Sequence, residues 1–194
     1  MTCLKSDPES IKKAVTCLKN GKVVILPTDT VYGFSGIVDT SVSGTAYKTD
    51  DRIRAIKGRA ETKPLIQLIA APEDISLYTE DHIPAVLLSK WPGALTIIVK
   101  NRIPCGTVYT TAFRCPGDAW LRKVISECGA PIYSTSVNRS GSPVLAKIAD
   151  IENEFGREVD LIIDAGDTEG ALPSTLVSIA DEKITVLRQG SVKI

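Results

Sequence analysis

The chain has 194 residues, of which 43% are hydrophobic and 24% charged, and its 23 basic and 23 acidic side chains give a formal net charge of zero. This composition is ordinary for a globular protein and excludes a strongly basic nucleic-acid-binding chain, although a local basic surface is still compatible with it. No apolar run approaches the roughly 18 residues of a membrane span, and residues 1–7 lack the apolar core of a signal peptide.

The N-terminal part predicts a helix and then a strand that ends abruptly. Asp7 can cap the helix, Pro8 suits its first turn, and apolar residues recur with helical spacing as far as residue 18. The continuously apolar run 23–26 is typical of a strand that is covered on both faces. It leads directly into the polar sequence 27–33, where the apolar pattern of a buried strand ends.

The remaining elements alternate between helices and strands and finish in a hairpin. Helical patterns fall at 46–56, 119–128 and 148–155, and shorter ones begin at residues 72 and 84. Strands are predicted at 65–70, 95–99, 108–114, 131–133, 161–164, 173–179 and 184–187. This alternation predicts an α/β fold with a mixed parallel and antiparallel sheet. No repeat and no break in composition divides the chain, so we expect one domain, 1–194.

The cysteine pattern favours free thiols over cross-links. The chain holds five cysteines, an odd number, and no two of them form a Cys-x-x-Cys pair. A disulfide framework and a cysteine zinc site are therefore both disfavoured. We expect a cytoplasmic protein with reduced thiols. The cysteines are Cys3, Cys17, Cys105, Cys115 and Cys128.

Familiar catalytic signatures are missing from the sequence. There is no Gly-x-x-x-x-Gly-Lys-Ser/Thr phosphate loop, no Gly-x-Gly-x-x-Gly, no His-Glu-x-x-His and no Gly-x-Ser-x-Gly. The single histidine, His82, stands just before a predicted helix and is interpreted as a surface residue. We therefore do not expect a Ser-His-Asp triad.

Polar side chains alternate where two of the predicted strands end. Ser134, Ser136 and Asn138 share one face of an extended segment. Thr28, Thr30 and Tyr32 alternate in the same way after Pro27 and share one face of another. Ligands in open α/β sheets bind just beyond the carboxyl ends of strands, so these ends could border one cavity. A Ser/Asn-rich turn and a strand with one solvated face explain the same patterns without a ligand.

Cations also stand at the ends of elements. Lys57 and Arg59 flank Gly58, so both could face one anion in an extended backbone, although a solvated basic helix end explains them equally. Arg114 and Arg188 each end an apolar run, where a surface charge is the simpler explanation. Taken together, cations, hydroxyls and amides without an acid–base pair suit the binding of a nucleoside triphosphate.

Several motifs, in order along residues 23–190, resemble those of the YrdC/Sua5 family, the threonylcarbamoyl-AMP synthases. The central match is Lys57-Gly-Arg59 with Ser136-Val-Asn138. The other matches are Leu26-Pro-Thr-Asp-Thr-Val-Tyr-Gly33, Lys63-Pro-Leu65, Trp91-Pro-Gly-Ala-Leu-Thr96, Ser134-Thr-Ser-Val-Asn-Arg-Ser-Gly141, Pro173-Ser-Thr175 and Leu187-Arg-Gln-Gly190.

The resemblance implies a fold and an activity. The fold would be a twisted mixed sheet with flanking helices and a large concave cavity. The activity would make threonylcarbamoyl-adenylate and pyrophosphate from L-threonine, bicarbonate or CO2, and ATP. Mg2+ would be bound mainly through the phosphates. The product would pass to the tRNA threonylcarbamoyl transferase machinery that modifies adenosine 37.

The resemblance also assigns residues, position by position. The nucleotide would contact Lys57, Arg59, Ser136 and Asn138, which form the catalytic tetrad, together with Ser134, Ser140 and Arg188. Threonine would lie among Thr28, Thr30, Tyr32, Thr111, Arg114 and Ser174. Asp29 could contact the cation indirectly, although no protein metal ligand is assigned. Arg139 is interpreted as a solvent-facing neighbour.

The sequence departs from the family pattern at several points. Ala60 stands where proline is usual after the arginine, and Leu68 stands where many members have a histidine. The stretch 36–56 is longer than expected, with 40–49 as the insertion. The chain ends soon after Arg188, so it resembles the short single-domain form.

Two other functions stay open at this point. A module of the same fold could bind double-stranded RNA or tRNA without adenylation activity, although the zero net charge counts against it. A paralogue could bind a nucleotide or transfer another carbamoyl group, although Ser136 and Asn138 are intact.

Overall fold

The computed structural model describes residues 1–39, 46–60, 64–100, 110–180 and 183–194. Lys63, Cys105 and most of the 40–49 insertion lie outside these ranges. The strands are β1 (Thr2–Leu4), β2 (Val24–Leu26), β3 (Gly33–Ile37), β4 (Ile66–Leu68), β5 (Leu95–Lys100), β6 (Thr110–Arg114), β7 (Ile132–Ser136), β8 (Leu161–Asp164), β9 (Thr175–Ser178) and β10 (Thr185–Arg188). The helices are α1 (Ser10–Lys19), α2 (Thr49–Lys57), the 3-10 helix η1 (Pro72–Leu77), α3 (Ala85–Leu88), α4 (Ala119–Cys128) and α5 (Ile148–Phe155).

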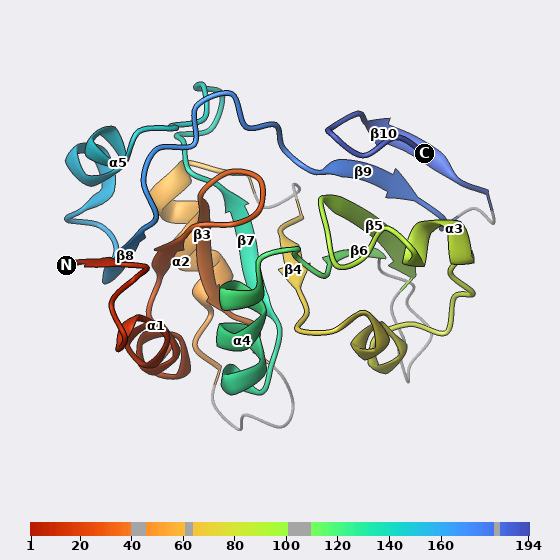
Figure 1. Ribbon diagram of the computed structural model, residues 1–194, viewed down its shortest axis with the longest axis horizontal. Helices are drawn as coiled ribbons and strands as arrows, with labels where there is room; N and C mark the ends of the chain where they lie inside the picture. Colours follow the sequence, from red (N-terminus) through yellow and green to blue (C-terminus); the bar gives the residue numbers. More distant parts are fainter. Residues whose placement is uncertain (40–45, 61–63, 101–109, 181–182) are drawn as a thin grey trace.

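The strands form one mixed sheet in the order β1-β8-β2-β3-β7-β4-β6-β5-β9-β10. Parallel pairs such as β2 with β8 and β5 with β9 stand beside antiparallel pairs such as β3 with β7. The predicted α/β fold with a mixed sheet is therefore confirmed. The C-terminal hairpin is confirmed too, because β10 pairs antiparallel with β9 at the edge of the sheet (Figure 1).

Helices cover both faces of the sheet on the β2 side, which explains the continuously apolar β2. Val24 and Leu26 belong to one core cluster with Leu18 of α1 and Val124 of α4, and α1 and α4 lie side by side (Figure 1). Ile25 points to the other face and packs in a second cluster with residues of α2 and α5. Successive strand residues point to opposite faces, so both faces of β2 must be apolar.

A third core cluster lies under η1 and α3. Leu87 of α3 and Ile75 of η1 pack there against residues of β5, β6 and β9, including Phe113. Phe113 also stacks on Tyr78, with ring centroids 5.1 Å apart. This cluster is distinct from the two that involve α1, α2, α4 and α5.

The structure corrects two details of the sequence prediction. Strand β3 was not predicted, because two glycines and a serine among its five residues weaken the strand signal; it is nevertheless fully buried between β2 and β7. Asp7 does not cap α1. The N-cap position is Glu9, and the Asp7 carboxylate instead accepts the Glu9 N–H and pairs with Lys13 at 2.6 Å.

Within the described ranges, no helix is both long enough and apolar enough to cross a membrane.

The close approach at Gly190 fixes the end of the hairpin against the start of β9. Its N–H donates to Thr175 Oγ1 at 2.9 Å, and a Cβ at this position would lie 2.2 Å from the Pro173 carbonyl oxygen. We predict that Gly190→Ala lowers the free energy of unfolding by about 1–3 kcal/mol, because backbone would have to move. Chemical denaturation measures this change. The exposed neighbour Ser191→Ala should change it by less than about 0.5 kcal/mol, and equal effects would contradict the steric explanation.

Candidate functional site

One cavity collects most of the residues that the sequence singled out. Its volume is about 230 Å³. The lining residues come from the loop after β2, the segment after α2, the strands β4, β6 and β7, and both sides of the C-terminal hairpin. They are Thr28, Thr30, Val31, Tyr32, Arg59, Pro64, Ile66, Arg114, Ser134, Thr135, Ser136, Val144, Pro173, Ser174 and Arg188.

The sheet register brings the two polar strand ends together. Gly33 of β3 pairs with Leu26, the last residue of β2, and also with Ser136, the last residue of β7. Because β3 runs antiparallel to both neighbours, β2 and β7 run in the same direction and end at the same edge. The prediction that both ends border one cavity is confirmed.

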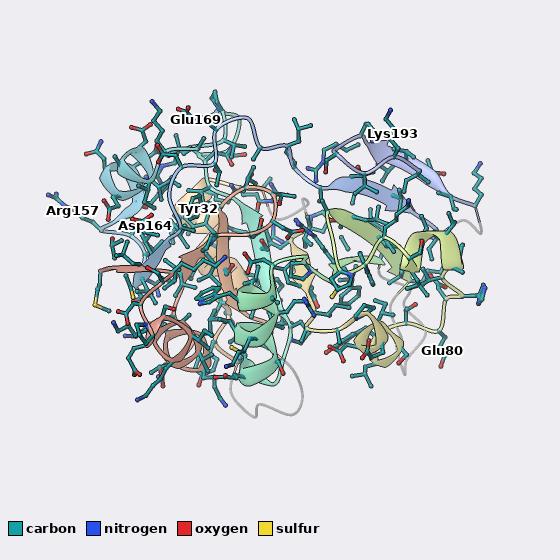
Figure 2. All side chains as sticks on the ribbon, in the orientation of Figure 1. Tyr32, Glu80, Arg157, Asp164, Glu169 and Lys193 are labelled. Carbon is teal, nitrogen blue, oxygen red and sulfur yellow. The ribbon has the colours of Figure 1, made fainter. Side chains whose placement is uncertain are left out.

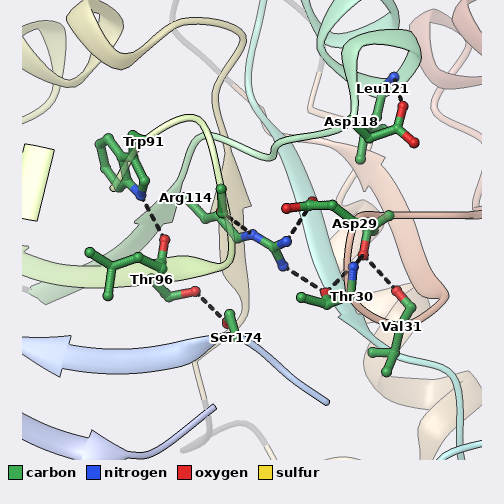
Figure 3. A network of polar contacts seen from close by, with 12 residues as sticks. Asp29, Thr30, Val31, Trp91, Thr96, Arg114, Asp118, Leu121 and Ser174 are labelled. Carbon is green, nitrogen blue, oxygen red and sulfur yellow. Dashed lines mark hydrogen bonds and ion pairs between the residues drawn. The ribbon is translucent and has the colours of Figure 1, made fainter. Parts of the chain in front are cut away.

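Arg114 is the centre of a buried polar network at one end of the cavity (Figure 3). Its Nη2 pairs with Asp29 Oδ1 at 2.5 Å, its Nη1 donates to Thr30 Oγ1 at 2.8 Å, and its Nε donates to the Gly93 carbonyl at 3.0 Å. Thr30 Oγ1 also lies 2.8 Å from Thr28 Oγ1. Because the Thr28 hydroxyl donates to the Val31 carbonyl, the Thr30 hydroxyl must donate to Thr28. Charge and proton positions are thus fixed before any ligand arrives.

A second arginine forms the opposite wall on the hairpin side. Arg188 donates to the Ser174 carbonyl through Nε at 3.1 Å and through Nη2 at 2.9 Å. The Ser174 hydroxyl lies 2.7 Å from Thr96 Oγ1 (Figure 3). Burial, and then the charge of Arg114, lower the pKa of Arg188. The two guanidinium groups are therefore close enough to repel each other, and an anion between them would relieve the repulsion.

Arg59 supplies a third guanidinium group. It donates from Nη2 to the Pro64 carbonyl at 3.1 Å, and burial together with Arg54 lowers its pKa. None of the described residues that line the cavity is acidic. The electrostatics of the cavity therefore favour an anionic ligand.

Lys57 does not stand beside Arg59 on the cavity wall, as the spacing suggested. Helix α2 ends at Lys57, and Gly58 turns the chain in the left-handed conformation, with φ 61°. The Lys57 side chain is only 2% exposed and is not among the lining residues, whereas Arg59 is. The prediction assumed an extended backbone, in which residues 57 and 59 point to the same side. Because the backbone here is the end of a helix followed by a left-handed glycine, the two side chains point in different directions.

The Lys57 ammonium group holds the backbone of the Ser136–Asn138 segment from behind. Nζ donates to the carbonyl of Ser136, to the carbonyl of Asn138 at 2.9 Å and to Asn138 Oδ1 at 2.9 Å. All three protons of the ammonium group are used. Burial, and secondarily Arg59, lower the pKa of Lys57 to about 8.

Ser134 and Ser136 reach the cavity, while Asn138 and Ser140 do not line it. The Ser136 hydroxyl donates to Asn138 Oδ1 at 2.8 Å, and the Asn138 amide donates to the carbonyls of Arg139 and Ser142. Ser140 contributes its backbone N–H, which donates to the Lys57 carbonyl at 2.7 Å. Asn138 and Ser140 therefore shape the loop that presents Ser136.

Tyr32 lines the cavity, and the positions of its hydroxyl, of Thr111 and of Arg139 add detail to the sequence interpretation. The Tyr32 hydroxyl points away from the cavity: it donates to the Gly166 carbonyl and accepts from the Ala165 N–H, both at 2.8 Å, on the side of Asp164 (Figure 2). Thr111 is three residues from Arg114, hence on the other face of β6, and does not line the cavity. Arg139 is partly solvent-facing, with its side chain 39% exposed, but it also forms ion pairs with Glu154 and Glu158.

The sequence interpretation missed some contributors to the site. Thr96 lay in a quoted motif without a role, although it alternates with the core residues Leu95 and Ile97 and must face the other side of β5. That alternation was the available signal. Leu68, at the position where a histidine was expected, is 1% exposed in the core cluster beside α4 and is not among the lining residues.

No group of three or more His, Cys, Asp or Glu side chains within the described ranges could hold a metal ion. His82 is exposed, as predicted. The site is therefore built from guanidinium groups and hydroxyls, with backbone carbonyls and Asp29 holding them in place.

Comparison with known proteins adds an independent line of evidence. The Sua5/YciO/YrdC family model, described as telomere recombination, matches residues 16–190. The chain belongs to this family. The threonylcarbamoyl-AMP synthase of Bacillus subtilis is 32% identical over 200 residues, covering 96% of this chain and 55% of that protein. The one from Pseudoalteromonas translucida is 30% identical over 189 residues and covers 92% of this chain and 98% of its own.

Solved structures agree with the fold. The H234A/Y235A variant of P. abyssi Sua5 superposes with a TM-score of 0.82 at 28% identity, covering 99% of this chain and 57% of that one. E. coli YciO has a TM-score of 0.81 at 22% identity, covering 100% and 95% of the two chains, and shows the shared fold. The chain spans about half the length of the Bacillus and Pyrococcus synthases that it matches.

The position of the Tyr32 hydroxyl gives a prediction that separates two roles. Tyr32→Phe removes the acceptor of the Ala165 N–H and the donor to the Gly166 carbonyl, both in a part-buried setting, so we expect the free energy of unfolding to fall by about 0.5–1.5 kcal/mol. Thermal or chemical denaturation measures this loss. An unchanged stability combined with weaker binding of a ligand in the cavity would show that the hydroxyl acts on the ligand instead.

Proposed function

We propose that the chain is an L-threonylcarbamoyladenylate synthase, a nucleotidyltransferase that uses L-threonine, bicarbonate or CO2, and ATP. The observation that carries the proposal is the cavity wall, where three guanidinium groups and several hydroxyls meet and the described part of the lining contains no acidic residue. Family membership and the names of the relatives support it. The P. abyssi Sua5 structure complexed with L-threonine, 29% identical with a TM-score of 0.79, supports an amino-acid substrate.

The proposed reaction needs no strong base at the transfer step. The threonine amine and bicarbonate give a carbamate and water, and a carbamate oxygen then attacks the α-phosphorus of ATP. A new P–O bond forms while the bond from the α-phosphorus to the bridging oxygen breaks, and the electron pair leaves with pyrophosphate. The protein must hold anions together and stabilise the leaving group, which positioned cations do. This requirement matches a cavity without a general base.

The geometry divides the proposed roles among the lining residues. Arg114 has five N–H donors, three of which are used in its network, so two stay available for the threonine carboxylate beside Thr28 and Thr30. Arg59, Arg188 and the Ser134–Ser136 side would hold the phosphates. Lys57 and Asn138 would act through the loop that they hold, and Ser174 through the position of Arg188.

Among the described residues, no group of carboxylates near the cavity offers a site for Mg2+. The candidate Asp29 has one carboxylate oxygen paired with Arg114, and the described residues that line the cavity include no carboxylate. Mg2+ would therefore be bound by the phosphates of ATP, and no step is assigned to a protein-bound ion.

The wider context of the proposed reaction follows from its product. Threonylcarbamoyl-AMP would be consumed by a tRNA threonylcarbamoyl transferase system in the cytoplasm. Direct binding of tRNA or double-stranded RNA is not favoured by any observation on the cavity, and the net charge is zero.

The decisive experiment measures pyrophosphate release by the purified chain with ATP and Mg2+. Release should require both L-threonine and bicarbonate, and threonylcarbamoyl-AMP should appear in equal amount by mass spectrometry. Tight ATP binding without any release would overturn the proposal. Salt-dependent RNA binding without release would favour the RNA-binding module instead.

Replacing Arg59 tests the cation of the cavity wall. We expect Arg59→Ala to lower kcat/KM for pyrophosphate release by at least about a hundredfold, the scale for losing one preorganised charge contact. The exposed Arg157→Ala is the matched control and should retain the wild-type rate. Near-wild-type turnover of the Arg59 variant would contradict its assignment.

The depressed pKa of Lys57 predicts opposite pH trends for activity and stability. As pH rises through about 8, Lys57 loses a proton and with it one of three hydrogen bonds, so pyrophosphate release should fall. The free energy of unfolding should rise between about 8 and 10.5, because the unfolded lysine binds a proton that the folded one does not. Rate profiles and denaturation curves across this range measure both trends. An identical alkaline decline in Lys57→Arg would contradict the assignment to Lys57.

A further inference from the structure

Arg139 makes an unusually complete set of contacts for a half-exposed side chain. Its Nε donates to Glu154 Oε1 at 3.0 Å, and its two terminal nitrogens donate to the two carboxylate oxygens of Glu158. Nη1 also donates to the carbonyl of Ile56, and the guanidinium carbon lies 4.5 Å from the centroid of the Phe155 ring. Arg139 therefore connects its own loop to α5, to the residues just after it, and to α2.

The contact with Ile56 completes the capping of α2. The last four carbonyls of a helix lack partners within it. Arg59 and Gly58 N–H groups satisfy the carbonyls of Arg54 and Ala55. The Ile56 carbonyl accepts from the Arg139 guanidinium and the Lys57 carbonyl from the Ser140 N–H. The C-terminus of α2 is thus capped partly by the loop that follows β7.

A chain of ring contacts joins Arg139 to Lys57 by a second path. The Phe155 ring packs edge-on against Phe34, with centroids 4.9 Å apart and planes at 88°. The Lys57 ammonium group lies 5.3 Å from the Phe34 centroid. Lys57 in turn holds Asn138, the neighbour of Arg139. Arg139 is thus connected to Lys57 by two paths, one through Phe155 and Phe34 and one through Asn138. We therefore expect a shift of Arg139 to affect Lys57 and Asn138 by both paths.

We propose that Arg139 is a positioning residue that holds the Ser136–Ser140 loop in register with the end of α2, and that it does so without touching substrate. The inference rests on the proposed function for its effect on rate. Arg139 does not line the cavity, so its influence must pass through Lys57, Asn138 and the Ser136 hydroxyl. A displacement of about 1 Å in such a group is enough to slow a reaction up to about a hundredfold.

The chain offers a matched control for loss of charge and ion pairing. Arg52 of α2 is 43% exposed at its side chain, compared with 39% for Arg139. It pairs with Asp160 at 2.7 Å and donates to the Glu158 carbonyl, but none of its recorded contacts is with the Ser136–Ser140 loop. Arg52→Leu therefore removes a similar ion pair from the same region while leaving the loop alone.

The experiment compares Arg139→Leu, Arg139→Lys and Arg52→Leu in the full chain. For Arg139→Leu we expect kcat for pyrophosphate release to fall at least about tenfold, with KM for threonine within about twofold of wild type. Arg52→Leu should retain the wild-type kcat at a similar melting temperature. Lysine can keep one ion pair but lacks the paired N–H donors of the guanidinium group. The kcat of Arg139→Lys should therefore lie between those of wild type and Arg139→Leu. Equal effects of the Arg139 and Arg52 variants on kcat would overturn the proposal.

The partners of Arg139 supply a second test. The double substitution Glu154→Gln and Glu158→Gln removes the carboxylates that pair with Arg139. It should lower kcat by about as much as Arg139→Leu does. Adding Arg139→Leu to it should then have little further effect. Fully additive losses would show that Arg139 acts by another route.

Hydrogen–deuterium exchange separates this inference from the proposed function. The Val137 and Ser140 N–H groups donate to the carbonyls of Tyr32 and Lys57 in the wild type. Both should exchange faster in Arg139→Leu and not in Arg52→Leu, whether or not the protein releases pyrophosphate. Unchanged exchange at Val137 and Ser140 would overturn the positioning role even if the synthase activity is found. Faster exchange in a chain without activity would refute the proposed function alone.

Discussion

The buried ammonium group of Lys57 is the interaction on which the site depends. It lies between the end of α2 and the loop after β7, and its three protons go to acceptors of Ser136 and Asn138. No carboxylate among the described residues pairs with it, so its stabilisation comes from backbone and amide dipoles and from the Phe34 ring, 5.3 Å away. A buried charge held by dipoles depends on the correct placement of those dipoles. The loop geometry and the charge therefore depend on each other.

The arginine side chains of the site differ from Lys57 in the partners that hold them. Arg114 is paired with Asp29, whereas Arg188 donates to the Ser174 carbonyl. Carbonyl acceptors orient a guanidinium group without cancelling its charge. The cavity thus retains positive potential while its side chains stay fixed. The cations and donors of such a cavity wall are already in place. They can therefore stabilise the charge that develops in a transition state without first having to move.

Local patterns predicted most of the elements, because apolar runs and helical spacing are local properties. The predicted bounds of α4, α5 and β8 agree with the structure. Strand β3 could not be predicted in this way, since Gly33 and Gly36 carry no strand preference and its burial comes from its neighbours. The motifs identified the correct lining segments, but side-chain direction was not encoded in them. The Tyr32 hydroxyl and the Lys57 ammonium group belong to correct segments and point elsewhere, because partners distant in the sequence decide where they point.

The position of Arg188 has a consequence for how the cavity opens. Arg188 stands on β10, an edge strand whose four residues are all exposed and whose sheet partner is β9 alone. Edge elements with few buried contacts are the parts of a fold that open first by local unfolding. One wall of the cavity therefore belongs to an exposed edge of the sheet, while another belongs to its interior. Binding of an anion to Arg188 would stabilise the folded hairpin against local unfolding. The folded hairpin would strengthen anion binding by the same free energy, because the coupling between the two equilibria is reciprocal.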